Sequence, residues 1–267
     1  MLAPTAPTAP ARAGARRLSG LEGPFASPPA WSPDGRELVI SAARGGGLDI
    51  ALVDATSGAW DWPIADASDE REPVFARGGA AILFSSNRTG AWEIHSFDRA
   101  SRRVRRWTEG GGAAARPRDE GGIWFVRPGL AGLWRQGSPA GQGPGGEAPG
   151  GEAPGGEGPI EGTPRGKTPG DETVLVDAGF LPTAASDWTA GGGSVWFTRW
   201  DAERTAWLAR LDLATGVTSD ALLLESPEAA SELHAGSGLW VSADGRRALV
   251  SSIDASQSDL WLRRAHR

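Results

Sequence analysis

The sequence predicts an all-β fold, a β-propeller of four-stranded blades. Five segments follow one template, and their starts lie about 40 to 50 residues apart once one insertion is removed, a period typical of propeller blades. Within each segment, short apolar runs alternate with turn signals, and helical periodicity is weak. The 39 glycines and 20 prolines exceed average usage and favour turns over long helices.

The five repeats start at Trp31, Phe75, Pro117, Trp188 and Val241. The first, WSPDGRELVISAARGGGLDIALVDATSG, is the clearest, whereas the third is degraded and lacks the turn pair. Repeats of this kind stack side by side as copies of one structural unit. We therefore expect about five blades, either closed into a ring or forming part of a ring of six to eight.

Each repeat opens with a tight turn and a buried strand. In Pro33-Asp34-Gly35, the Asp can bond its own backbone and the Gly supplies a positive φ, so the chain reverses at little steric cost. The apolar runs that follow suit strands buried on both faces. These second strands are expected at Glu37–Ser41, Ala81–Ser85, Ser194–Thr198 and Arg247–Ser251.

A third and a fourth strand complete each repeat. The segments LDIALVD, WEIHSFD, AWLARLD and SDLWLRR alternate apolar with polar or small residues, which predicts half-buried third strands. Weaker fourth strands are expected at Val104–Thr108 and Val217–Leu224. The fifth repeat stops soon after Leu262 without a fourth strand, while Ala15–Gly20 parallels the fourth strand at Val104–Gly110. We expect the N-terminal strand to complete the last blade, which removes two exposed sheet edges.

Two segments are too poor in apolar residues to bury surface. Residues 1–14 are rich in Pro and Ala, and residues 137–172 are rich in Gly, Pro and Glu, with the phrase GGEAP repeated. Such compositions predict disorder. We therefore assign the propeller to residues 15–267 and place 137–172 as a disordered insertion in the third repeat, between a third strand near Trp134 and a fourth strand at TVLVD.

Composition excludes several classes of function. A net charge of −6 argues against nucleic-acid binding by this chain, although the basic patch Arg102, Arg103, Arg105 and Arg106 could bind an acidic ligand. With no Cys, disulfides and cysteine metal sites are excluded. No apolar run is long enough for a signal peptide or a membrane span. We expect a cytoplasmic location by default, and a periplasmic one if the chain is part of a longer membrane-anchored regulator.

The motifs for catalysis and cofactor binding are weak. GTPRGKT at Gly162–Thr168 has three residues between its glycines where a phosphate-binding loop needs four. His95, His234 and His266 lie beside no nucleophile elbow and form no zinc pattern. The acidic cluster Asp66, Asp69, Glu70 and Glu72 lacks the spacing of a calcium loop and is interpreted as a solvated inter-blade loop. We predict no catalytic residue, no cofactor and no metal.

Recurrence within the repeat also guides the interpretation of single residues. Tryptophans recur in or beside third strands (Trp92, Trp134, Trp207, Trp261) and at repeat starts (Trp31, Trp188), which favours packing between blades over ligand binding. Polar residues recur after the second strands, where they should line one rim of the ring. The candidate binding residues, with ordinary solvated turns as the alternative, are Arg44, Arg88, Arg199, Asp201 and Asp254.

The repeats resemble a known family. AWSPDGRELVIS together with LDIALVDATSG is similar to the TolB-type, WD40-like Asp-Gly repeat of bacterial β-propellers. LDLATG, followed by VSADGRRALVSSIDASQSDLWL, resembles the C-terminal propeller region of CadC-like winged-helix transcriptional regulators. Similar repeats occur in the propellers of prolyl-oligopeptidase-type peptidases. No winged helix or peptidase domain is present in the sequence, so the resemblance transfers neither DNA binding nor catalysis, and it transfers no site residue.

These observations predict a non-catalytic, monomeric TolB-like propeller that mediates protein–protein interaction, as the sensor part of a transcriptional regulator. Rigid propellers present loops at their two faces, and function usually resides there. Two alternatives stay open. The chain could be the propeller domain of a peptidase or other enzyme whose catalytic part is absent, or a non-functional remnant of a longer regulator.

Overall fold

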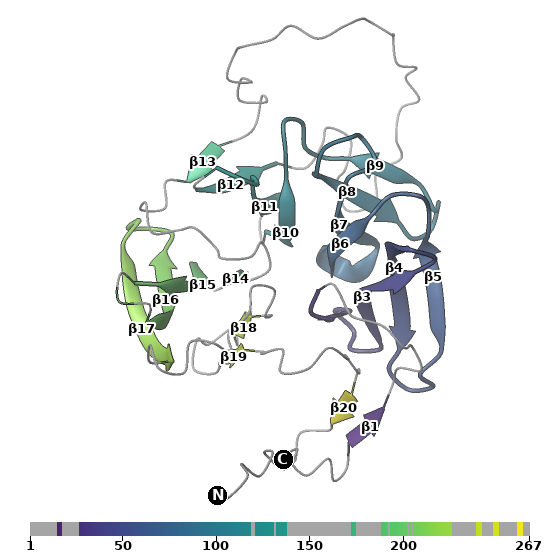
Figure 1. Cartoon of the computed structure of the whole chain (residues 1–267), viewed down its shortest axis with the longest axis horizontal. Coiled ribbons are helices and arrows are strands. Elements are labelled where there is room, and N and C mark those ends of the chain that lie inside the picture. Colours follow the sequence, from purple (N-terminus) through teal and green to yellow (C-terminus); the bar gives the residue numbers. More distant parts are fainter. Residues whose placement is uncertain are drawn as a thin grey trace, which may run out of the picture.

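The computed structural model consists almost entirely of antiparallel β-sheet (Figure 1). It describes residues 15–17, 27–118, 121–130, 132–137, 172–174, 188–191, 193–201, 203, 205–225, 239–241, 248–250 and 261–263. Within these ranges the only helix is the short 3₁₀ turn η1 (Arg77–Gly79). No helix of the described residues is long and apolar enough to cross a membrane.

Four sheets each contain four strands in sequence order. The first consists of β2 (Ala30–Trp31), β3 (Glu37–Arg44), β4 (Gly47–Asp54) and β5 (Trp60–Ile64). The second consists of β6 (Glu70–Phe75), β7 (Ala81–Ser86), β8 (Glu93–Asp98) and β9 (Val104–Arg106). The third consists of β10 (Ala113–Pro117), β11 (Ile123–Val126), β12 (Leu133–Gln136) and β13 (Glu172–Val174). The fourth consists of β14 (Trp188–Gly191), β15 (Ser194–Trp200), β16 (Ala206–Asp212) and β17 (Thr218–Glu225).

The remaining strands form two short ladders. One joins β18 (Leu239–Val241) to β19 (Ala248–Val250), and the other joins β1 (Ala15–Arg17) to β20 (Trp261–Arg263). The expected pairing of the N-terminal strand with the last strand is therefore confirmed. The described residues keep the two ladders separate, so they do not form a four-stranded fifth sheet. The four-stranded sheets follow one another in chain order around the molecule (Figure 1).

The expected repeat architecture agrees with these sheets. The third repeat forms four strands although it lacks the Asp-Gly pair, because Gly121 and Gly122 both adopt a positive φ and the Gly121 N–H bonds the Arg118 carbonyl oxygen at 3.2 Å. The insertion lies between β12 and β13, which pair directly, so its two ends are adjacent. The predicted disorder is wrong for Glu172, which already belongs to β13 and pairs with Arg135. Residues 138–171 and 1–14 fall outside the described residues.

The third strands are more deeply buried than the alternating pattern predicts. All residues of β8 except Asp98 are buried, and five consecutive residues of β4 are buried. The prediction of half-buried strands is wrong for these two sheets. For β8 the reason is that the first and third sheets cover its two faces, whereas residues of β4 pack against the second sheet on one face and against Trp60 and Trp62 of their own sheet on the other. In β16 the exposed Arg210 does alternate with buried residues.

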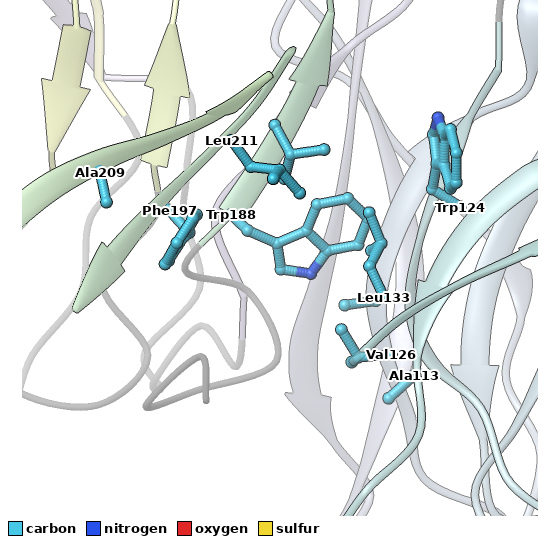
Figure 2. Packing of buried hydrophobic residues seen from close by; sticks show 10 residues of the cluster. Ala113, Trp124, Val126, Leu133, Trp188, Phe197, Ala209 and Leu211 are labelled. Atoms are coloured by element: carbon cyan, nitrogen blue, oxygen red, sulfur yellow. The ribbon is translucent and has the colours of Figure 1, made fainter. Parts of the chain in front are cut away.

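The core consists of apolar layers between successive sheets. One layer joins the first and second sheets and contains Val39, Ile50, Phe84 and Phe97 among others. Another joins the third and fourth sheets, where the Trp188 indole lies between Leu133 and Leu211 (Figure 2). Trp188 is completely buried, as expected of a packing residue. Trp31 is 47% exposed, and the packing role expected for it is wrong.

Candidate functional site

A polar pocket lies where the first sheet meets the second. Because neighbouring strands are antiparallel, the hairpin after β3 and the connection after β5 lie at the same end of the sheet. The pocket between them has a volume of about 700 Å³. Its lining comes from the β3–β4 hairpin, the β5–β6 connection and the start of the β7–β8 loop: Arg44, Gly45, Gly46, Gly47, Asp49, Ala65, Asp66, Ala67, Asp69 and Asn87.

The glycine-rich hairpin forms one wall of this pocket. Arg44 pairs with Gly47, and the two residues between them, Gly45 and Gly46, have φ values of 60° and 97°. Two consecutive positive φ values define the tight hairpin turn whose twist matches that of the flanking strands, and glycine adopts them without strain. The sequence GGG therefore folds back sharply and brings the start of β4 close to the β5–β6 connection.

Hydrogen bonds fix the opposite wall. Asp69 Oδ1 accepts a bond of 3.0 Å from the Leu48 N–H, which ties the connection to the hairpin. The Asp69 N–H donates to Asn87 Oδ1 at 3.0 Å, which ties it to the second sheet. Asp66 closes a local turn by accepting the Ser68 N–H at 2.9 Å. The pocket is thus a preformed feature that both sheets hold in place.

Asp49 is the most unusual residue of the pocket. It is only 5% exposed, and its Oδ1 has no hydrogen-bond partner among the residues that the structure describes. Burial raises the pKa of its carboxyl group, and the charges of Asp66 and Asp69 add to that rise. The charge of Arg44 and a hydrogen bond from the Asp66 backbone lower this pKa and so oppose the rise. A buried carboxylate oxygen without a partner carries a free-energy cost of desolvation that a bound cation would offset.

A second buried acid lies beside the pocket, at the start of β6. Glu70 is fully buried, and its Oε1 accepts bonds from Ser86 Oγ at 3.0 Å and from the Arg88 guanidinium at 3.1 Å. The same Arg88 nitrogen also bonds Asp66 at 3.1 Å. Burial raises the Glu70 pKa to about 7, although the bonds from Ser86 and Arg88 work in the opposite direction. Glu70 therefore changes its charge near neutral pH.

Glu93 of the second sheet shows how a similar acid is held when its partners are present. Its carboxylate accepts bonds from Arg106 at 2.8 Å, from Thr108 Oγ1 at 2.6 Å and from the N–H groups of Gly110 and Gly111 at 3.0 and 3.1 Å. These donors come from β9 and from the connection that follows it. Arg106 belongs to the basic patch identified in the sequence, and its charge is paired within the fold.

Two of the five candidate rim residues lie at the pocket or next to it. Arg44 lines it, with its guanidinium carbon 4.9 Å from the centre of the Trp62 ring. Arg88 binds Asp66 at its edge. Both arginines lie seven positions after the first residue of their second strands, β3 and β7, which places them at equivalent points of the repeat.

The other candidates belong to the fourth sheet or are not described. Arg199 lies within β15 rather than in a loop, and its guanidinium bonds both Asp220 oxygens, at 2.8 and 2.6 Å. Asp201 accepts bonds from Trp207 Nε1 at 2.9 Å and from the Thr205 N–H at 2.8 Å. Both bonds lower the Asp201 pKa, the Trp207 bond more strongly. Asp254 lies outside the described residues.

Sequence reasoning misjudged the acidic residues. Interpreting Asp66, Asp69, Glu70 and Glu72 together as a solvated loop was wrong for the last two, because both belong to β6 and Glu70 is fully buried. Asp49 was missed. The available signal was an acidic residue inside LDIALVD, since charged residues are rarely buried without a partner.

Of the histidines weighed for catalysis, the structure describes only His95. His95 is buried, stacks on Phe84 and contacts the Glu93 carbonyl oxygen through Nδ1 at 3.1 Å, a packing position. Burial lowers the pKa of its imidazole. Across the described ranges, no three His, Cys, Asp or Glu residues form a group able to hold a metal ion. His234, His266 and Gly162–Thr168 fall outside these ranges.

Comparison with solved structures finds similar folds. The chain is similar to TolB from Acinetobacter baumannii, with 18% identity, a TM-score of 0.56, and 88% of this chain and 55% of that chain covered. It also matches a TolB from Agrobacterium tumefaciens (16% identity, TM-score 0.39, 89% and 61% covered). A third match is a puromycin-hydrolyzing peptidase from Mycobacterium tuberculosis (15% identity, TM-score 0.49, 79% and 31% covered).

The Acinetobacter structure shows that the fold is a TolB-type β-propeller. The chain spans little more than half the length of the two TolB structures that it matches. No family model matches the sequence. No curated protein matches it either.

Proposed function

We propose that this chain is a non-catalytic TolB-like propeller that binds another protein through the end of the sheets that carries the pocket. The observation behind this proposal is the pocket at the boundary of the first two sheets, with a volume of about 700 Å³. Its walls are loops held in place by hydrogen bonds to two sheets. A preformed surface of this kind binds with little ordering cost.

The extension of this proposal to the sensor part of a transcriptional regulator rests on sequence resemblance. The segments that carry it are Leu211–Gly216 and Val241–Leu262. The described lining of the pocket contains no Ser, Cys, Lys or His, which supports the non-catalytic part of the proposal.

A pocket-filling variant tests the proposal directly. Ala67 is exposed and lines the pocket, so Ala67→Trp should obstruct it without disturbing the core. Ala100 is equally exposed in the β8–β9 turn, at the opposite end of the sheets, and Ala100→Trp is the matched control. The immobilised chain is incubated with an extract of its source cells, and the captured proteins are quantified by mass spectrometry.

We expect a protein that the wild type and Ala100→Trp retain equally and that Ala67→Trp loses. Capture that both tryptophan variants reduce equally, or that neither reduces, would place the interaction elsewhere. Hydrolysis of a peptide pool by the purified chain would contradict the non-catalytic part of the proposal.

A further inference from the structure

Asp49 and Glu93 occupy the same position in two copies of the repeat. Asp49 lies opposite Ala42 of β3, and Glu93 lies opposite Ser86 of β7. Each acid lies five residues before the aspartate that ends its strand, Asp54 or Asp98. Both acids are almost completely buried. Their surroundings can therefore be compared group by group.

The two acids differ in the cation that faces them. In the second sheet, the Arg106 guanidinium binds Glu93 at 2.8 Å. Counted from the pair Val53–Trp60, which corresponds to Phe97–Val104, Trp62 stands in the place of Arg106. The ladder shifts register between Leu52 and Ile50, and counted from the pair Ile50–Ile64 the equivalent residue is Pro63, which is not a cation either. The first sheet therefore lacks the internal guanidinium. Asp49 Oδ1 is left without a hydrogen-bond partner among the described residues, and the pocket adjoins it.

The charges in the pocket favour a cation. Asp49, Asp66 and Asp69 line it, and Arg44 is the one basic residue in the lining. The described acids are not grouped as ligands for a metal ion. A guanidinium is larger than a metal ion and planar, it carries five N–H donors, and it is weakly hydrated, so it can bond carboxylates that lie too far apart to share a metal ion. Asp66 already accepts a guanidinium, that of Arg88.

We propose that this pocket binds the guanidinium group of an arginine side chain presented by a partner protein, with Asp49 as its principal acceptor. The inference rests on the proposed function, because it specifies the chemistry of the partner. In this arrangement an arginine from outside takes the place that Arg106 occupies in the second sheet. Arg44, which lines the pocket, lies with its guanidinium carbon 4.9 Å from the centre of the Trp62 ring, an aromatic face on which guanidinium groups stack.

Arg44 thereby acts as a competitor for the bound arginine. It is exposed, and its charge favours the ionised form of Asp49. Removal of this charge leaves Asp49 without the cation that opposes its negative charge, while Asp66 keeps its bond with Arg88. We therefore expect Arg44→Ala to tighten the binding of a cationic ligand and Asp49→Asn to weaken it. These opposite effects distinguish a binding site from a general loss of structure.

The test uses short blocked peptides, Ac-Gly-Arg-Gly-NH₂ and its lysine and citrulline counterparts, with binding to the full chain followed by NMR titration. Citrulline has the shape of arginine without its charge. We expect the arginine peptide to bind at least about tenfold more tightly than the citrulline peptide, because a charge-assisted hydrogen bond to a buried acid is lost. Asp49→Asn should weaken arginine binding by about tenfold, and Arg44→Ala should strengthen it severalfold.

The control variant is Asp61→Asn, which removes an exposed aspartate from the neighbouring strand β5 and should leave binding unchanged. Thermal unfolding of each variant verifies that it is folded. Equal binding of the arginine and citrulline peptides, or full binding by folded Asp49→Asn, would overturn the inference. Calcium binding that depends on Asp49, without peptide binding, would replace it with a metal site.

The inference and the proposed function fail in different ways. If a protein is captured in a manner that depends on Ala67 but not on Asp49, protein binding stands and the arginine site falls. If the arginine peptide binds through Asp49 but no protein is captured, the arginine site is confirmed and the proposed binding of a partner protein is contradicted.

Discussion

Glu72 in β6 and Ala114 in β10 are joined across the second and third sheets by a hydrogen bond of 2.8 Å from the Ala114 N–H to Glu72 Oε2. Both residues adopt a positive φ, 55° and 51°, at interruptions of the ladders that β6 and β10 form with their neighbours. Ser85 Oγ donates to the same carboxylate oxygen at 2.8 Å. The two irregular strands are thus held together by one acidic side chain.

Loss of this carboxylate should weaken the contact between the two sheets. We expect Glu72→Ala to lower the free energy of unfolding by about 1 kcal/mol, since Ser85 Oγ still accepts the Ala114 N–H at 3.0 Å. Glu72→Gln keeps an acceptor oxygen and should lose less. Urea unfolding of both variants measures the difference, and equal losses would show that the hydrogen bond contributes nothing.

The carboxylate of Glu93 should order the connection between the second and third sheets. Glu93→Ala removes the acceptor of Thr108, Gly110 and Gly111, and we expect a loss of about 2 to 3 kcal/mol. Hydrogen exchange of the Gly110 and Gly111 amides should accelerate together. The control is Asp98→Ala, which removes an exposed acceptor of the Ser101 N–H and should leave those amides protected.

Stability should decrease as the pH rises through neutrality, because of Glu70. Its folded-state pKa of about 7 exceeds the usual 4.5, so the folded chain binds more protons than the unfolded chain between these values. The stabilisation from the protonated acid is complete below about pH 4.5 and is lost as the pH rises through about 7. We expect a decrease of up to about 3 kcal/mol between pH 5 and pH 8.

The variant Glu70→Gln isolates this contribution. His95 acts in the opposite direction, because its lowered pKa removes stability as the pH falls below about 6.5. Its effect is common to the wild type and the variant and cancels in their difference. If the difference in urea midpoint between the two proteins does not change with pH, the pKa of Glu70 is not raised.

Alanine substitutions at three glycines distinguish the stability cost of steric contact from that of backbone strain. A Cβ on Gly122 would lie 2.2 Å from the Gln136 carbonyl oxygen, while a Cβ on Gly129 or Gly137 meets nothing within 4 Å. Gly129 has a φ of 76°, so Gly129→Ala should cost about 1 kcal/mol from strain alone. We expect more than about 2 kcal/mol for Gly122→Ala and less than about 0.5 kcal/mol for Gly137→Ala, measured by thermal unfolding.

The β1–β20 ladder can be tested by a new disulfide. Ala15 lies directly opposite Arg263, a separation that suits an S–S bond, and the chain has no cysteine of its own. The double variant Ala15→Cys with Arg263→Cys should oxidise to a form that migrates faster on a non-reducing gel. The matched pair Ala15→Cys with Ala248→Cys should stay reduced, since β1 and β19 do not pair. Equal oxidation of both pairs would contradict the register.

The positions of the strands were predictable because their signals are local. β16 has the predicted bounds, Ala206–Asp212, and β3, β7 and β15 contain the predicted runs. Each is an apolar segment that a turn follows or precedes. The pairing of β1 with β20 was also predictable, since a repeat without a fourth strand leaves an edge that a strand from the other end can cover.

Burial and charge pairing were not predictable, because they depend on neighbouring sheets. The alternation in β4 and β8 gives no sign that both faces of these strands are buried. The pocket places Asp49 beside residues 65–69 and Asn87, which the sequence separates. Only the register between the repeats shows that the first sheet has no cation where the second sheet has Arg106.

The pairing of β1 with β20 also determines when the fold can be completed. Each of the four-stranded sheets consists of consecutive strands and can form soon after it leaves the ribosome. β1 is synthesised before the four sheets and its partner β20 after them, so β1 waits unpaired for a time on the order of tens of seconds. During that interval the unpaired backbone of β1 can form hydrogen bonds with a strand of another nascent chain. The β1–β20 ladder can therefore form only after translation has passed β20.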